Sequence, residues 1–139
     1  MRVIQQNPPN YQELKRSFPI DDTRFNPLFP FGEVLYNPRG VEIPEDVLFH
    51  EEIHSRQQKH FTSPEVWWSK YILDKTFRLN QEVEAYSAQL KFIKKHVSNK
   101  IAKEVLFELA SNLSSDLYRL NLSYQQAESM IRSRARNTK

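Results

Sequence analysis

Residues 44–59 read PEDVLFHEEIHSRQQK, and this stretch decides how the rest of the chain is interpreted. Proline suits the first position of a helix because the N–H that it lacks would be unpaired there, and the acidic Glu45 and Asp46 favour the positive end of the helix dipole. The sequence therefore predicts a helix from Glu45 to about Lys59. Within this helix, residues 50–54 have the pattern HExxH.

The two histidines of this pattern are typical of a metal site. On a helix, His50 and His54 project from the same face about one turn apart, so their imidazoles can converge on one zinc ion. Glu51 lies about 100° around the helix from His50, where its carboxylate can take a proton from a water on the metal. The alternative interpretation is a pair of partly exposed histidines on an amphipathic helix that binds no metal.

A second acidic stretch offers a third ligand. Residues 81–89 read QEVEAYSAQ and continue a helical pattern. A catalytic zinc site needs three protein ligands and one open position for water. Either Glu82 or Glu84 can supply the missing ligand.

HEEIHSRQQ, an aromatic-rich stretch and EVEAYSAQ together resemble the gluzincin metallopeptidases. The resemblance covers residues 31–95 and is closest to small phage and bacterial forms, including the ImmA/IrrE type. It implies a zinc metalloendopeptidase in which His50, His54 and Glu82 bind Zn²⁺ and Glu51 is the general base. Glu82 matches the family better than Glu84 because a small residue, Ala85, follows it at a spacing of three.

The chain departs from the family at one position. Many gluzincins have Asp or Asn four residues after the ligand glutamate, where it orients a motif histidine, and this chain has Tyr86 there. A ligating imidazole needs such a partner to fix its tautomer. We expect Tyr86, Gln89 or a backbone carbonyl to provide it, and Gln57 lies on the same face as His54.

The segments before the motif predict the β part of an α+β, mainly α fold with a zincin-like core. The proline-rich residues 1–30 are interpreted as an irregular wrap with one helical turn near Tyr11–Lys15. Gly32–Tyr36 is rich in strand formers, and the turn at 37–40 predicts that Val41–Ile43 returns as the second strand of a small antiparallel hairpin. The strand at Gly32–Tyr36 is expected to align an extended peptide by backbone pairing.

The segments after the motif predict helices in a single domain of residues 1–139, with a catalytic core at 31–97 and C-terminal helices and a basic tail at 98–139. Start signals and apolar spacing place these helices. They begin at Ser63-Pro64, near Asn80, near Ile101, and at the capping box formed by Ser123 and Gln126. Residues 132–139 are interpreted as a frayed tail. Trp67, Trp68, Tyr71 and Phe77 are expected to fill the core rather than form a substrate subsite.

Composition excludes several other classes of site. The 139 residues include no cysteine and two glycines, so thiol chemistry, disulfides and glycine-rich phosphate loops are excluded. The net charge of +3 does not favour a nucleic-acid-binding chain.

No segment is apolar enough to span a membrane and MRVIQQNPPN has no signal-peptide core, so we expect a cytoplasmic protein of a cell or a phage-infected host. The expected partner is a peptide or protein substrate. The alternative is a zinc-binding regulatory or partner-recognition protein without general proteolytic activity.

Overall fold

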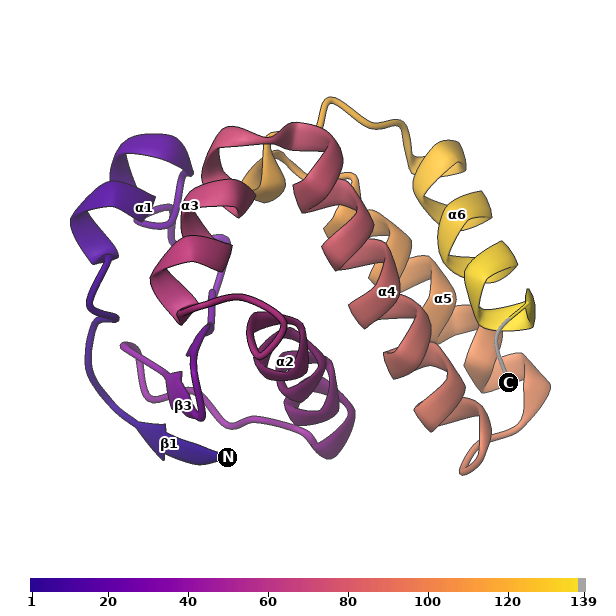
Figure 1. Ribbon diagram of the computed structural model, residues 1–139. Coiled ribbons are helices and arrows are strands. Elements are labelled where there is room, and N and C mark those ends of the chain that lie inside the picture. The colour runs from indigo at the N-terminus through magenta and orange to yellow at the C-terminus, as the bar shows by residue number, and fades with distance from the viewer. Residues whose placement is uncertain (138–139) are drawn as a thin grey trace.

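The computed structural model describes residues 1–137, which form a mainly helical fold with one small sheet (Figure 1). Six α-helices are present in these residues: α1 (Tyr11–Ser17), α2 (Glu45–Gln58), α3 (Pro64–Leu73), α4 (Lys75–Lys94), α5 (Asn99–Leu113) and α6 (Tyr124–Asn137). A short 3-10 helix, η1 (Asp116–Tyr118), connects α5 to α6. Helix α2 lies between the sheet and α4, and α4 packs in turn against α5 and α6 (Figure 1).

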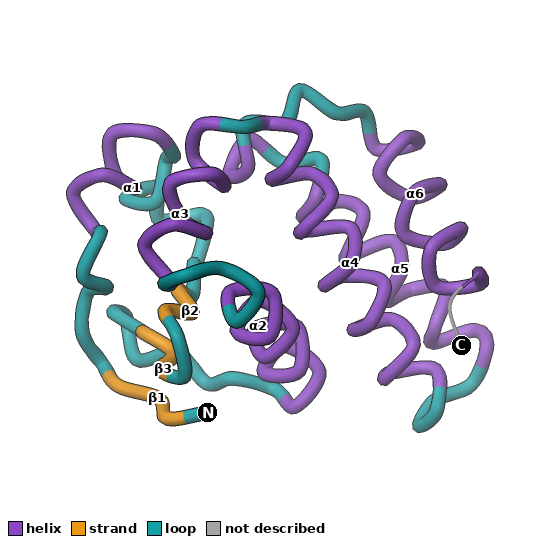
Figure 2. The backbone as a smooth tube through the Cα atoms, viewed as in Figure 1, coloured by secondary structure: helices purple, strands orange, loops and turns teal. Residues whose placement is uncertain are grey.

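The sheet has three short strands in the order β1–β3–β2, namely Arg2–Ile4, Val34–Tyr36 and Phe29–Phe31 (Figure 2). Strand β1 runs parallel to β3, and β2 runs antiparallel to it. The sheet is therefore mixed, and the N-terminal segment that the sequence predicted to be irregular supplies two of its strands. Gly32 makes the tight β2–β3 turn possible because its φ of +63° is one that L side chains rarely adopt.

The predicted return strand at Val41–Ile43 is wrong. The turn before it is confirmed, since the Gly40 amide donates to the Asn37 carbonyl at 3.0 Å. The Asn37 side chain then pairs with both backbone groups of Val41, accepting from its N–H at 3.1 Å and donating to its carbonyl at 2.8 Å. Because these groups are occupied, Val41 cannot join a ladder, and β2 takes the place beside β3 instead.

Most helix boundaries follow the predicted start signals. Ser63 caps α3 by accepting from the Val66 amide, and Ser123 and Gln126 exchange both hydrogen bonds of a capping box at α6. The predicted start near Asn80 is wrong, because α4 begins at Lys75. Asp74 ends α3 and also caps α4, accepting from the Phe77 amide at 3.0 Å, so no loop separates the two helices.

The C-terminal tail is more ordered than the sequence predicted. Helix α6 continues through residues 132–137, which the sequence interpreted as frayed, and residues 138–139 lie outside the described part of the chain. Within residues 1–137, no helix combines the length and apolar composition that crossing a membrane requires.

Two separate apolar clusters flank α2. One lies among α4, α5 and α6 and includes Leu90, Leu113 and Ile131, each with no measurable exposure. The other joins the N-terminal segment to α3 through residues such as Leu14 and Trp67. Because the apolar clusters lie on either side, the space between α2 and α4 is available for polar groups.

Arg78, near the start of α4, joins three parts of the fold because its side chain donates hydrogen bonds to backbone carbonyls of α3 and of the η1 segment. Its guanidinium is buried and donates to four carbonyl oxygens, which belong to Tyr71, Ile72, Tyr118 and Arg119. The side chain therefore holds the end of α3 and the segment around η1 against α4.

We expect Arg78→Met to lower the free energy of unfolding by about 3 kcal/mol, since four buried or partly buried carbonyls lose a charged donor. Urea unfolding followed by circular dichroism measures this change. Arg132→Met is the matched control, because exposed Arg132 forms a surface ion pair with Glu128 whose loss should cost less than about 1 kcal/mol. Equal effects of the two substitutions would contradict the structural role of Arg78.

Candidate metal centre

Helix α2 buries its polar residues and leaves its apolar ones half-exposed. The buried side chains of this helix are all polar: His50, Glu51, His54, Ser55, Gln57 and Gln58. Its apolar residues, Val47, Leu48, Phe49 and Ile53, are only partly buried. Burying polar groups costs free energy unless each finds a partner, so a helix that served only for packing would show the opposite pattern.

Two of these polar residues fix α2 against the β2–β3 turn. Ser55 donates to the Gly32 carbonyl at 2.6 Å. The Gln58 side chain accepts from the Gly32 amide at 2.7 Å and donates to the Pro30 carbonyl at 2.8 Å. The hairpin therefore sets the position and rotation of α2, which in turn aims the two histidines at α4.

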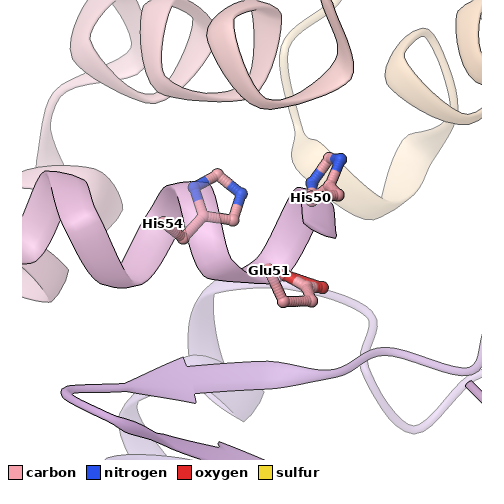
Figure 3. A group of neighbouring side chains, drawn as sticks. All are labelled: His50, Glu51 and His54. Carbon is pink, nitrogen blue, oxygen red and sulfur yellow. The ribbon is translucent and has the colours of Figure 1, made fainter. Parts of the chain in front are cut away.

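His50, Glu51 and His54 form a buried group that could hold a metal ion. One ligand atom from each residue lies within 4.8 Å of the others. Figure 3 shows both imidazoles on one side of α2, while Glu51 leaves the helix toward the strands. The histidines are 5% and 3% exposed, so they are buried and are not the partly exposed pair that the alternative interpretation supposed.

Glu82 on α4 faces the same two imidazoles. One of its carboxylate oxygens lies 3.3 Å from Nε2 of His50, and the other lies 3.2 Å from Nε2 of His54. Tyr71 also donates to Glu82 Oε2 at 2.6 Å. Glu84, the alternative that the sequence left open, points elsewhere: it accepts from Gln57 at 2.7 Å and pairs with Arg134 at 3.3 Å.

Two glutamines determine how the histidines present their nitrogens. Gln57 Oε1 lies 2.8 Å from Nδ1 of His54, and Gln89 Oε1 lies 3.0 Å from Nδ1 of His50. The amide nitrogens are engaged elsewhere, since Gln57 donates to the Gln81 carbonyl and Gln89 donates to Asp46. Each Nδ1 must therefore carry the proton and donate it to an amide oxygen, which leaves Nε2 facing Glu82.

The pKa values reflect the close approach of the Glu82 carboxylate to both imidazoles. Burial alone would raise the pKa of Glu82, but attraction to His54 and hydrogen bonds from both histidines hold it well below its usual range. Burial alone would lower the pKa of His54, yet the charge and hydrogen bond of Glu82 raise it to about 9. Burial raises the pKa of Glu51 against the opposing charges of His50 and His54.

We expect Gln57→Leu and Gln89→Leu each to weaken metal affinity by about 10- to 100-fold, because the corresponding imidazole loses the acceptor that fixes its tautomer. Competition with a chelating zinc indicator measures this affinity. Gln125→Leu, at an exposed position on α6, is the matched control and should leave affinity unchanged. Wild-type affinity in both test variants would show that the glutamines do not orient the histidines.

A cavity of about 270 Å³ adjoins the histidines, Glu51 and Glu82. Residues 24–30 of the proline-rich segment form part of its wall, and Leu117 and Tyr118 of η1 form another part. Trp67 is fully buried in the N-terminal cluster and also lines the cavity, as do its neighbours Trp68 and Tyr71. These three aromatics therefore belong to the core, as predicted, but they also line the cavity beside the histidines, which the sequence did not predict.

Two tyrosines meet in this cavity. The ring of Tyr86 packs edge-on against the His50 imidazole, with 4.4 Å between centroids. Its hydroxyl lies 2.6 Å from that of Tyr118. Tyr86 therefore contacts the ring of His50, while Gln89 takes the orienting position at Nδ1. Sequence reasoning missed Tyr118 and Asp46, because neither has a motif or helical spacing that relates it to HExxH.

The sheet cannot align an extended peptide along the strand at Gly32–Tyr36, although the sequence predicted that it would. Strand β3 pairs with β1 on one side and with β2 on the other, so it has no free edge for an extended peptide. At the middle of β2, Pro30 has no N–H, and its carbonyl accepts from both Gln58 and Trp68. Backbone pairing between a peptide and Val34–Tyr36 is therefore excluded in this arrangement.

The two remaining histidines and Tyr124 do not line the cavity. His60 and His96 are exposed, and Tyr124 packs against Phe107 on α5. Compared with known proteins, the chain matches no protein-family model, no curated sequence and no solved structure.

Proposed function

We propose that this protein is a zinc-dependent peptidase in which His50, His54 and Glu82 hold the metal and Glu51 is the general base. The observation that carries the proposal is the position of the Glu82 carboxylate, within 3.3 Å of Nε2 on both histidines. These three side chains are the ligand set that the resemblance to gluzincins implies. The cavity beside them would receive the substrate.

The donor geometry supports zinc as the ion. Zinc–ligand bonds of about 2.0–2.2 Å at tetrahedral angles separate neighbouring donor atoms by roughly 3.3–3.6 Å. The nitrogen–oxygen distance of 3.3 Å to His50 lies at the short end of this range, and the distance of 3.2 Å to His54 lies just below it. Two imidazoles and one carboxylate also leave a fourth position open, as catalytic zinc sites do.

A zinc ion bound there would supply a water of lowered pKa and would polarise the scissile carbonyl. Glu51 accepts a proton from the attacking water at a carboxylate oxygen and returns it to the leaving amine nitrogen. Its carboxylate lines the cavity and makes no hydrogen bond to the rest of residues 1–137, so it is available for this role. Gln57 and Gln89 hold the imidazoles, and the buried surroundings exclude bulk water from the site.

The direct test is the metal content of the purified protein, together with turnover of a pooled, fluorescence-quenched peptide library. The proposal predicts one tightly bound zinc per chain and hydrolysis that a chelator abolishes and added zinc restores. Absence of stoichiometric zinc would refute the proposal. Zinc without hydrolysis of any library member would instead favour the regulatory or partner-recognition alternative.

A further inference from the structure

A second concave surface lies between α2 and α4, away from the cavity that contains the histidines. It is a groove of about 870 Å³. Helix α2 contributes Phe49 and Ile53 to it, and α4 contributes Ala88 and Phe92. None of these four residues lines the cavity of the metal centre, so the groove is a separate surface.

The floor of the groove is apolar and already organised. Phe49 and Phe92 stack across the two helices with 5.1 Å between ring centroids, and Phe61 meets Phe77 edge-on at 5.7 Å. All four rings are partly exposed. Two packed helices that present half-exposed rings between them form the kind of surface that receives the apolar face of another helix.

The rim of the groove is strongly basic. Four cationic side chains line it: Arg56, Lys91, Lys95 and Arg134. Its one carboxylate is Glu84, which pairs with Arg134. The lining therefore carries a net charge of +3, from four cations and one anion, which equals the formal charge of the whole chain. A partner that fits this surface must combine apolar anchors with acidic flanks.

We propose that this groove binds an acidic amphipathic helical segment of a partner protein. The apolar face of the segment packs on Phe49, Ile53 and Phe92, and its acidic side chains face Arg56 and Lys95. Nucleic acid fits less well, because the rings are packed against one another along two helices instead of standing free to stack on bases. The proposal does not rest on peptide hydrolysis, since no residue that lines the groove also lines the cavity. Gln57 links the two surfaces, because it lines the groove and contacts His54.

Binding can be tested with a fluorescein-labelled synthetic peptide of about 18 residues that has Leu and Phe at helical spacing and Glu elsewhere. Two comparison peptides replace either Glu by Lys or the apolar residues by Ser. Fluorescence anisotropy should show that the full-length protein binds the acidic amphipathic peptide about tenfold more tightly, or better, than either comparison peptide. If the serine peptide bound as tightly as the acidic amphipathic peptide, the groove would be a non-specific basic patch and the proposal would be overturned.

The charge-reversal variant Arg56→Glu/Lys95→Glu should weaken peptide binding by about tenfold or more. Both side chains are exposed, so the fold should tolerate the change. Lys100→Glu/Lys103→Glu on exposed positions of α5 makes the same change in net charge and should leave binding intact. Equal losses in the two variants would overturn the proposal. The proposal would also be overturned if the protein bound a single-stranded oligothymidine more tightly than the acidic amphipathic peptide. It would be overturned as well if the protein self-associated and only the Arg56/Lys95 variant abolished that self-association.

Discussion

Glu51→Gln should lower peptide hydrolysis by about two to four orders of magnitude while the protein keeps its zinc. Glutamine has nearly the same shape as glutamate but cannot accept the proton of the attacking water. Metal binding should persist because the proposed ligands are His50, His54 and Glu82. Turnover of a quenched peptide and zinc content, measured on the same preparation, separate the two properties.

Glu52→Gln is the matched control for this experiment. Glu52 is the next residue on α2 but lines a different surface, beside Met1 and Lys59. Its substitution should change neither turnover nor zinc content. If Glu51→Gln retained full activity, Glu51 would not be the general base, although the proposed ligand set would be unaffected.

The second large effect is expected from Glu82→Gln, which should weaken zinc affinity by about 100-fold or more. Binding free energies of about 10–16 kcal/mol shared among four ligands correspond to roughly 3 kcal/mol per ligand. Indicator competition measures the affinity, and thermal unfolding checks that the variant remains folded. The amide retains the shape of the side chain but lacks the negative charge that faces both imidazoles.

Glu84→Gln provides the comparison within the same helix. Glu84 contacts Gln57 and Arg134 rather than the imidazoles, and an amide oxygen can still accept from Gln57. Its zinc affinity should stay close to that of the wild type. The reverse result, with affinity lost in Glu84→Gln and kept in Glu82→Gln, would transfer the third ligand to Glu84 and leave the class of site intact.

The parts of the fold that the sequence predicted correctly depend on local signals. Proline and acidic residues at 44–46 begin α2, Ser63 begins α3, and Ser123 with Gln126 begins α6. In each case the deciding contacts lie within a few residues of one another. Short-range capping chemistry can therefore be inferred without knowing the tertiary structure.

The errors come from contacts that are distant in sequence or unusual in their partners. The strand at Phe29–Phe31 contains a proline, which usually argues against a strand, but Pro30 lies on an edge and its carbonyl is satisfied by Gln58 and Trp68. The turn at 37–40 predicts a return strand that begins at Val41, but the Asn37 side chain occupies both backbone groups of Val41 and prevents that pairing. Neither outcome follows from propensity alone.

The candidate site shows the same division. The spacing of HExxH predicted that His50 and His54 share a face, and the resemblance to gluzincins favoured Glu82 over Glu84 beside them. The structure brings His50, His54 and Glu82 together. The roles of Gln57 and Gln89 were open, because a glutamine on a helix is most often solvated. Only the packing of α2 against α4 determines which amide oxygen reaches which imidazole.

Pro30 also bears on how the protein avoids aggregation. An exposed sheet edge can recruit a strand from another molecule through its unpaired N–H and carbonyl groups. On the β2 side, the central residue has no N–H to offer and its carbonyl is already doubly engaged, so growth of the sheet in that direction stops. Intermolecular pairing would have to begin at β1, where Arg2 is exposed and its charge disfavours stacking of identical chains.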